Sequence, residues 1–128
     1  MYVSIGYNEN VTLVNGIVNV AIAVKTYMPK SAAWVKGGAG TDHSLNHEQR
    51  HFDIAKIVAE RFKRKILAEN LPVDNFDGPI NVEYLEIFRE MDRLQKKYDG
   101  ETNHGTDPAA QTRWNERIDR ELRELEVK

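Results

Sequence analysis

The N-terminal part of the chain alternates between apolar and polar positions with a period of two. Four β-branched residues, at positions 18, 20, 22 and 24, alternate with polar or small residues, which is typical of a half-buried strand. Asn15-Gly16 stands just before them and is the strongest short-range signal for a hairpin turn. We therefore predict an antiparallel pair of strands over residues 2–28, with a bend near residues 8–10. Residues 33–35 are predicted to form a further short strand.

Beyond the glycine-rich segment 37–40, the apolar positions recur at helical spacing. Ser44 is the predicted N-cap of a first helix that runs to about residue 69. After a loop that includes residues 77–79, Asn81 is expected to cap a second helix ending at residues 99–100. Asp107, followed by Pro108, is expected to cap a third. The residues predicted to face the core are Leu45, Phe52, Ala55, Ala59, Phe62 and Ile66 in the first helix, Tyr84, Phe88, Met91, Leu94 and Tyr98 in the second, and Trp114, Ile118, Leu122 and Leu125 in the third.

Composition narrows the class of protein. The 128 residues suit a single domain, predicted to be α+β with a β-rich part (1–36) and a helical part (44–128). The hairpin, or a small sheet containing it, is expected to pack on the three helices. The net charge of −2 comes without a basic block, which argues against nucleic-acid binding. We expect no membrane span and find no signal-peptide pattern. The absence of cysteine excludes thiolate chemistry and disulfides.

The segment His47-Glu48-Gln49-Arg50-His51 is an H-E-x-x-H motif in the first turns of the predicted first helix. Histidines four residues apart on a helix face the same way and can converge on one metal ion. Glu48 would lie close to that metal without binding it, where it can act as a general base on a metal-activated water. The alternative is an exposed, charged helix turn. Zinc is the metal that we expect, although imidazoles also suit other first-row ions.

A catalytic zinc site needs a third protein ligand. His104, in the polar segment between the second and third helices, is the main candidate, with Glu101 as the alternative. His43 is expected to be a solvated loop histidine. Asp53 lies too far around the helix to reach the same ion, so we expect it to hold a ligand imidazole or an arginine, or to form a surface ion pair. Tyr98 is a candidate oxyanion donor, and the alternative for it is a tyrosine of the core.

Two segments carry a family resemblance: His47-Glu-Gln-Arg-His-Phe-Asp-Ile-Ala55 and Tyr98-Asp-Gly-Glu-Thr-Asn-His-Gly105. Together they resemble the bacterial domain of unknown function 922, described as secreted zinc-dependent proteases. The resemblance implies a minimal zincin-like metallohydrolase with His47 and His51 as zinc ligands and Glu48 as catalytic base. It also supports His104, and it implies a periplasmic or secreted location.

Three functional hypotheses follow. The first is a zinc-dependent peptidase that acts on a peptide or protein substrate. The second is a metal-stabilised binding or assembly module without catalysis, in which a fourth ligand such as Glu101 closes the site. The third is a hydrolase of a non-peptide amide in the cell envelope. An open coordination position beside Glu48 separates the first hypothesis from the second.

Overall fold

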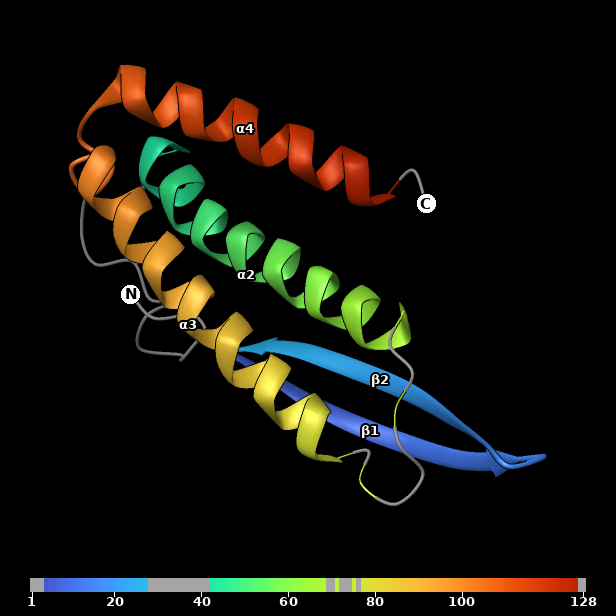
Figure 1. Cartoon of the computed structure of the whole chain (residues 1–128). Helices are drawn as coiled ribbons and strands as arrows, with labels where there is room; N and C mark the ends of the chain where they lie inside the picture. The colour runs from blue at the N-terminus through green and yellow to red at the C-terminus, as the bar shows by residue number, and fades with distance from the viewer. Residues whose placement is uncertain (1–3, 28–41, 69–70, 72–74, 76, 127–128) are drawn as a thin grey trace.

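The N-terminal hairpin lies against a bundle of helices (Figure 1). The computed structural model describes residues 4–27, 42–68, 71, 75 and 77–126. Strands β1 (Ser4–Val14) and β2 (Ile17–Tyr27) pair antiparallel, and helices α2 (Asp42–Ala68), α3 (Asp77–Glu101) and α4 (Pro108–Glu126) follow. This order confirms the predicted α+β class. None of the helices in this described part has the length and apolar content needed to cross a membrane.

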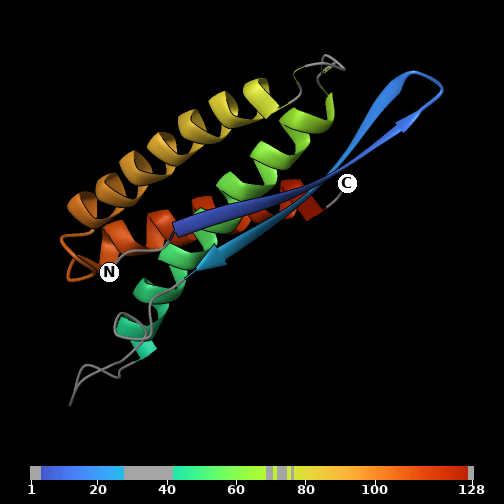
Figure 2. The same ribbon diagram turned by 90° about the horizontal axis from the view of Figure 1, so that it is seen from below.

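The hairpin turns at Asn15-Gly16, as predicted. The backbone φ angles of these two residues are 52° and 77°, and a two-residue turn of this kind needs a positive φ at both positions. The register runs without interruption from Ser4↔Tyr27 to Val14↔Ile17, so the predicted bend near residues 8–10 is wrong. In Figures 1 and 2 the turn projects beyond the helices. The strand predicted at residues 33–35 lies outside the described residues.

Helix α2 is the centre of the molecule, because it contacts α3, α4 and both strands. It therefore buries two sides rather than the single stripe that we predicted. The first core joins the hairpin, α2 and α3, and contains Ile5, Ala55, Val58, Ala59, Phe62, Ile66, Ile80, Ile87 and Met91. The second joins α2, α3 and α4, and contains Ile54, Ile57, Tyr98, Trp114 and Ile118. Two residues expected in the core are instead exposed: Leu45 (47%) and Phe88 (37%).

Helix α3 begins earlier than its sequence suggests. The predicted loop at residues 77–79 is wrong, because these residues form the first turn of the helix. The Asn75 side chain accepts a hydrogen bond from the backbone N–H of Gly78 at 3.3 Å, which caps the helix. Pro79 is tolerated there because the first-turn N–H groups have no partner within the helix. Helix α4 begins as predicted, with Ala110 N–H donating to the Asp107 carboxylate at 3.1 Å.

Two carboxyl groups meet where the hairpin approaches the start of α3. Glu9 of β1 faces Asp77, and one oxygen of Glu9 is buried without a hydrogen-bond partner among the described residues. The hydrogen bond with Asp77 raises the pKa of Glu9, and burial and the Asp77 charge add to this, so that it rises from 4.5 to about 7. Glu9 therefore holds its proton more tightly in the folded protein than in the unfolded chain.

The sign of this pKa shift predicts how stability changes with pH. The contribution of Glu9 is complete below the unfolded pKa of 4.5 and is lost as the pH rises through about 7. Replacing Glu9 with Gln should flatten this loss, so that the variant unfolds at a higher urea concentration than the wild type at pH 8. At pH 4 the urea concentrations at which the two proteins unfold should differ least. Urea unfolding at several pH values checks this, with Glu86→Gln on the exposed side of α3 as the control. A parallel pH dependence in wild type and Glu9→Gln would contradict it.

Candidate metal centre

Both histidines of the motif point into the bundle at the N-terminal end of α2. Their exposed fractions are 5% for His47 and 2% for His51, and their ring centroids lie 5.1 Å apart. Asp99, near the end of α3, reaches across to both. Its Oδ1 atom lies 3.0 Å from Nε2 of His47 and 2.7 Å from Nε2 of His51. Two imidazoles and one carboxylate thus converge on one point between α2 and α3.

Two glutamines fix which nitrogen of each ring carries the proton. Gln95 donates through Nε2 to the backbone carbonyl of His51 at 2.9 Å, so its Oε1 must be the atom that faces Nδ1 of His51. Gln111 donates through Nε2 to Tyr98 Oη and to Asn115, so its Oε1 faces Nδ1 of His47 at 2.7 Å. An amide oxygen only accepts, so both Nδ1 atoms are donors.

The consequence is a site that needs positive charge. With Nδ1 protonated, the neutral rings of His47 and His51 present Nε2 lone pairs to the Asp99 carboxylate, which has no proton to give. Such contacts are favourable only when protons or a cation lie between the facing lone pairs. The three ligand atoms lie within 4.8 Å of one another. Tetrahedral ligands about 2.0–2.1 Å from a zinc ion stand roughly 3.3 Å apart, so a small outward shift accommodates one.

Tyr98 supports this group from inside the bundle. It is fully buried, and its ring stacks on that of His47 with centroids 4.7 Å apart. Its hydroxyl donates to the backbone carbonyl of His47 at 2.9 Å and accepts from Gln111 at 2.7 Å. Burial, the largest cause, raises the pKa of Tyr98 above its usual range. Because the hydroxyl proton is already donated to a carbonyl, this geometry matches a tyrosine of the core better than an oxyanion donor.

A left-handed turn holds the far side of His47. Asn103, His104 and Gly105 all have positive φ, at 50°, 54° and 87°. The turn brings Gly105 so close to the His47 ring that a Cβ atom there would lie 2.8 Å from its Cγ. Glycine is therefore required at this position for both its φ and its size.

The two residues predicted as third ligand lie outside the cluster. The His104 side chain is 79% exposed, and its Nδ1 is 4.0 Å from Oδ2 of Asp99. Glu101 points toward α4, where it accepts a hydrogen bond from the Trp114 indole at 3.0 Å. The third member of the candidate group is Asp99. The sequence did point to Asp99, because it belongs to the same polar segment as Glu101 and His104, and a carboxylate is a common third zinc ligand.

Glu48 lies next to His47 in the first turns of α2. It is half-buried, and its Oε2 is buried without a hydrogen-bond partner in the part of the chain that the structure describes. Its charge also reaches the Tyr98 hydroxyl, where it contributes to the raised pKa. A buried carboxylate oxygen without a partner is costly, which makes Glu48 a candidate for a functional role.

Asp53 joins α2 to α4 through an arginine. Arg50 lies 3.4 Å from one Asp53 oxygen and donates to Asp119 of α4 at 2.6 and 3.3 Å. The Arg50 guanidinium holds the pKa of Asp119 below its usual range. We predicted that Asp53 would hold an imidazole or an arginine, or form a surface ion pair. In the structure its partner is an arginine, Arg50. His43 falls in the first turn of α2 rather than in a loop.

The fold and the site define an α+β protein in which a hairpin and three helices present two histidines and a carboxylate as a candidate metal-binding group. The chain belongs to the family described as Bacterial protein of unknown function (DUF922), whose model matches residues 18–105. The match includes all three residues of the group, Glu48 and Gly105. Searches of curated proteins and of solved structures each found no significant match.

The contact between Gly105 and His47 generates a prediction. Gly105→Ala should displace the His47 ring and lower zinc affinity by about 10–100-fold, the usual effect of disturbing an outer partner of a ligand. Gly100→Ala is a matched control, because Gly100 also lies near the end of α3 and a Cβ added there would have no atom within 4 Å. Competition with a chromophoric chelator measures both affinities. Equal zinc affinities for the two variants would show that Gly105 does not position His47.

Replacing each candidate third ligand identifies the one that binds. Asp99→Ala should lower zinc affinity by more than about 100-fold. The loss of a residue that only holds a ligand in place already costs about 10–100-fold, and the loss of a ligand itself should cost more. His104→Ala should change it far less, because its imidazole is exposed and outside the cluster. The same competition assay checks both variants. The opposite ranking would assign the third ligand to His104.

Proposed function

We propose that this protein is a zinc-dependent peptidase, with His47, His51 and Asp99 as the zinc ligands and Glu48 as the general base. The observation that carries the proposal is the convergence of the two Nε2 atoms on Asp99 Oδ1, at 3.0 and 2.7 Å. Two histidines and one carboxylate are a ligand set of known zinc hydrolases. When bound, zinc lowers the pKa of a coordinated water and polarises a carbonyl group.

The chain's own residues supply the rest of the chemistry. Gln95 and Gln111 hold the two imidazoles with Nδ1 protonated, which leaves both Nε2 lone pairs for the metal. Glu48 takes the proton of the attacking water and delivers it to the leaving amine. Its Oε2, which has no hydrogen-bond partner among the described residues, supports this role, because a base that already accepted a strong hydrogen bond would be weaker.

Two further observations support a hydrolase over a closed structural site. The cluster found in the described residues has three members rather than four. Asp99 keeps 24% of its side chain exposed, so the group has a side open to solvent. The hairpin beside the motif-bearing helix is compatible with a zincin-like arrangement, in which a sheet flanks the active-site helix. A peptide or protein substrate and an extracytoplasmic location complete the proposal.

Replacing Glu48 with Gln tests the catalytic role. The variant should keep its zinc and lose hydrolysis by about 10²–10⁴-fold, the usual contribution of a general base. Fluorescein-labelled casein and a mass-spectrometric digest of a peptide mixture are the probes, and elemental analysis reports the zinc. Glu60→Gln, three turns further along α2 and paired with Arg64, is the control. Hydrolysis at the wild-type rate by zinc-loaded Glu48→Gln would contradict the proposal.

A further inference from the structure

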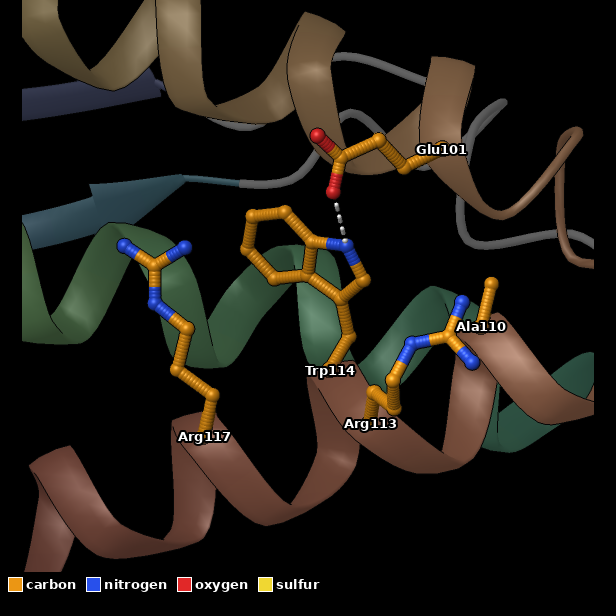
Figure 3. Close-up of a pocket in the computed structure, with 5 residues that line it drawn as sticks. All are labelled: Glu101, Ala110, Arg113, Trp114 and Arg117. Atoms are coloured by element: carbon orange, nitrogen blue, oxygen red, sulfur yellow. Dashed lines mark hydrogen bonds between the residues drawn. The ribbon is translucent and has the colours of Figure 1, made fainter.

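A second site lies between the end of α3 and the first half of α4. It is a pocket of about 150 Å³, lined by Glu101 of α3 and by Ala110, Arg113, Trp114 and Arg117 of α4. Figure 3 shows the Trp114 indole between two guanidinium groups, with Glu101 above its N–H. None of these residues belongs to the metal-binding group, and none has a role in the proposed hydrolysis.

The hydrogen-bond donors left free in this pocket are positively charged. The indole N–H is taken, because Trp114 donates to Glu101 at 3.0 Å. Arg117 lies over the indole with Cζ 4.7 Å from the ring centroid, and its Nε faces Glu121 at 3.5 Å. The side chain of Arg113 has no hydrogen bond or ion pair with any other described residue. The donors left for a ligand are therefore guanidinium N–H groups. The carboxylate of the lining, Glu101, accepts from the indole and lies 4.0 Å from Lys97.

The two arginines outnumber the single carboxylate of the pocket lining. Arg113 and Arg117 are four residues apart on α4, where like charges repel each other. An anion in the pocket offsets that repulsion and accepts charge-assisted hydrogen bonds from Arg113, whose side chain has no partner among the described residues. The floor of the pocket is apolar, formed by the indole face and the Ala110 methyl group. A ligand for this site should therefore combine negative charge with a short apolar stem.

We propose that this pocket binds a carboxylate on a short aliphatic stem, which is the chemistry of an acidic side chain or of the last residue of a peptide. The flat, two-oxygen carboxylate matches the forked donors of arginine. The small volume admits one such group rather than a folded surface. Inorganic phosphate fits less well, because its greater charge would lie close to the Glu101 carboxylate and nothing in it would contact the indole.

This pocket is close to the candidate metal-binding group but shares no residue with it. The Trp114 ring contacts that of Tyr98 edge-on at a centroid distance of 5.3 Å, and Tyr98 in turn stacks on His47. The binding proposed here does not require zinc or hydrolysis, so it can be tested whether or not the protein is a peptidase.

Fluorescence of Trp114 provides a direct test. The chain has two tryptophans, so Trp34→Phe leaves Trp114 as the sole reporter in the full chain. At low salt this protein is titrated with four probes: acetyl-Ala-Ala-Glu-Ala-amide, acetyl-Ala-Ala-Gln-Ala with a free carboxylate, acetyl-Ala-Ala-Gln-Ala-amide and inorganic phosphate. We expect at least one charged peptide to bind about tenfold or more tightly than the neutral one, as charge-assisted hydrogen bonds predict. Which charged peptide binds identifies the source of the carboxylate.

Charge variants decide whether the pocket is responsible. Arg113→Gln should weaken binding by about tenfold, the loss expected for one charge-assisted hydrogen bond. Arg117→Gln should weaken it less, because the Arg117 guanidinium lies across the indole and already faces Glu121. Arg120→Gln removes the same charge from an exposed position of α4 outside the pocket and should leave binding unchanged. The proposal is overturned if the neutral peptide or phosphate binds as tightly as the charged peptides. It is also overturned if no probe perturbs Trp114, or if the Arg120 variant loses as much affinity as Arg113→Gln.

Discussion

The contact of one carboxylate oxygen with two imidazole nitrogens is the constraint on which the rest of this structure depends. Asp99 Oδ1 lies 3.0 Å from His47 and 2.7 Å from His51, and neither ring has an Nε2 proton in the neutral form that the glutamines select. Three buried or half-buried groups that all offer lone pairs repel one another unless positive charge lies between them. A divalent cation meets that requirement directly.

Each helix contributes to this arrangement, so the site exists only in the assembled bundle. Helix α2 provides the histidines, α3 provides Asp99 and Gln95, and α4 provides Gln111. The polar residues gather where the three helices meet, while the apolar cores fill the rest of the bundle. Figure 1 shows this meeting point at the N-terminal end of α2, next to the α3–α4 connection. Because no single segment holds these three groups together, a metal ion bound by them would stabilise the folded bundle.

The sequence was informative where the signal was local. Asn15-Gly16 predicted the hairpin turn, Asp107-Pro108 predicted the start of α4, and His47 with His51 predicted two members of the group. Each signal depends on a few neighbouring residues and a simple geometric rule. The start of α3 was missed because Pro79 usually marks a loop, whereas here it stands in a first helical turn capped by Asn75.

What the sequence left open depends on how the helices cross. Asp99, Gln95 and Gln111 are ordinary polar residues along the chain, and only packing of α3 and α4 on α2 shows that they meet the histidines. His104 was favoured because histidine is a good ligand, but the left-handed turn at residues 103–105 leaves its side chain exposed and places Gly105 against His47 instead.

The most direct test of this account is the metal content of the purified wild-type protein, measured by elemental analysis without added metal. Converging lone pairs from His47, His51 and Asp99 predict about one zinc ion per chain, in keeping with the ligand set. A protein that contains no metal, and that takes up none when zinc is offered at neutral pH, would contradict the account. The three groups would then be held together by protons alone.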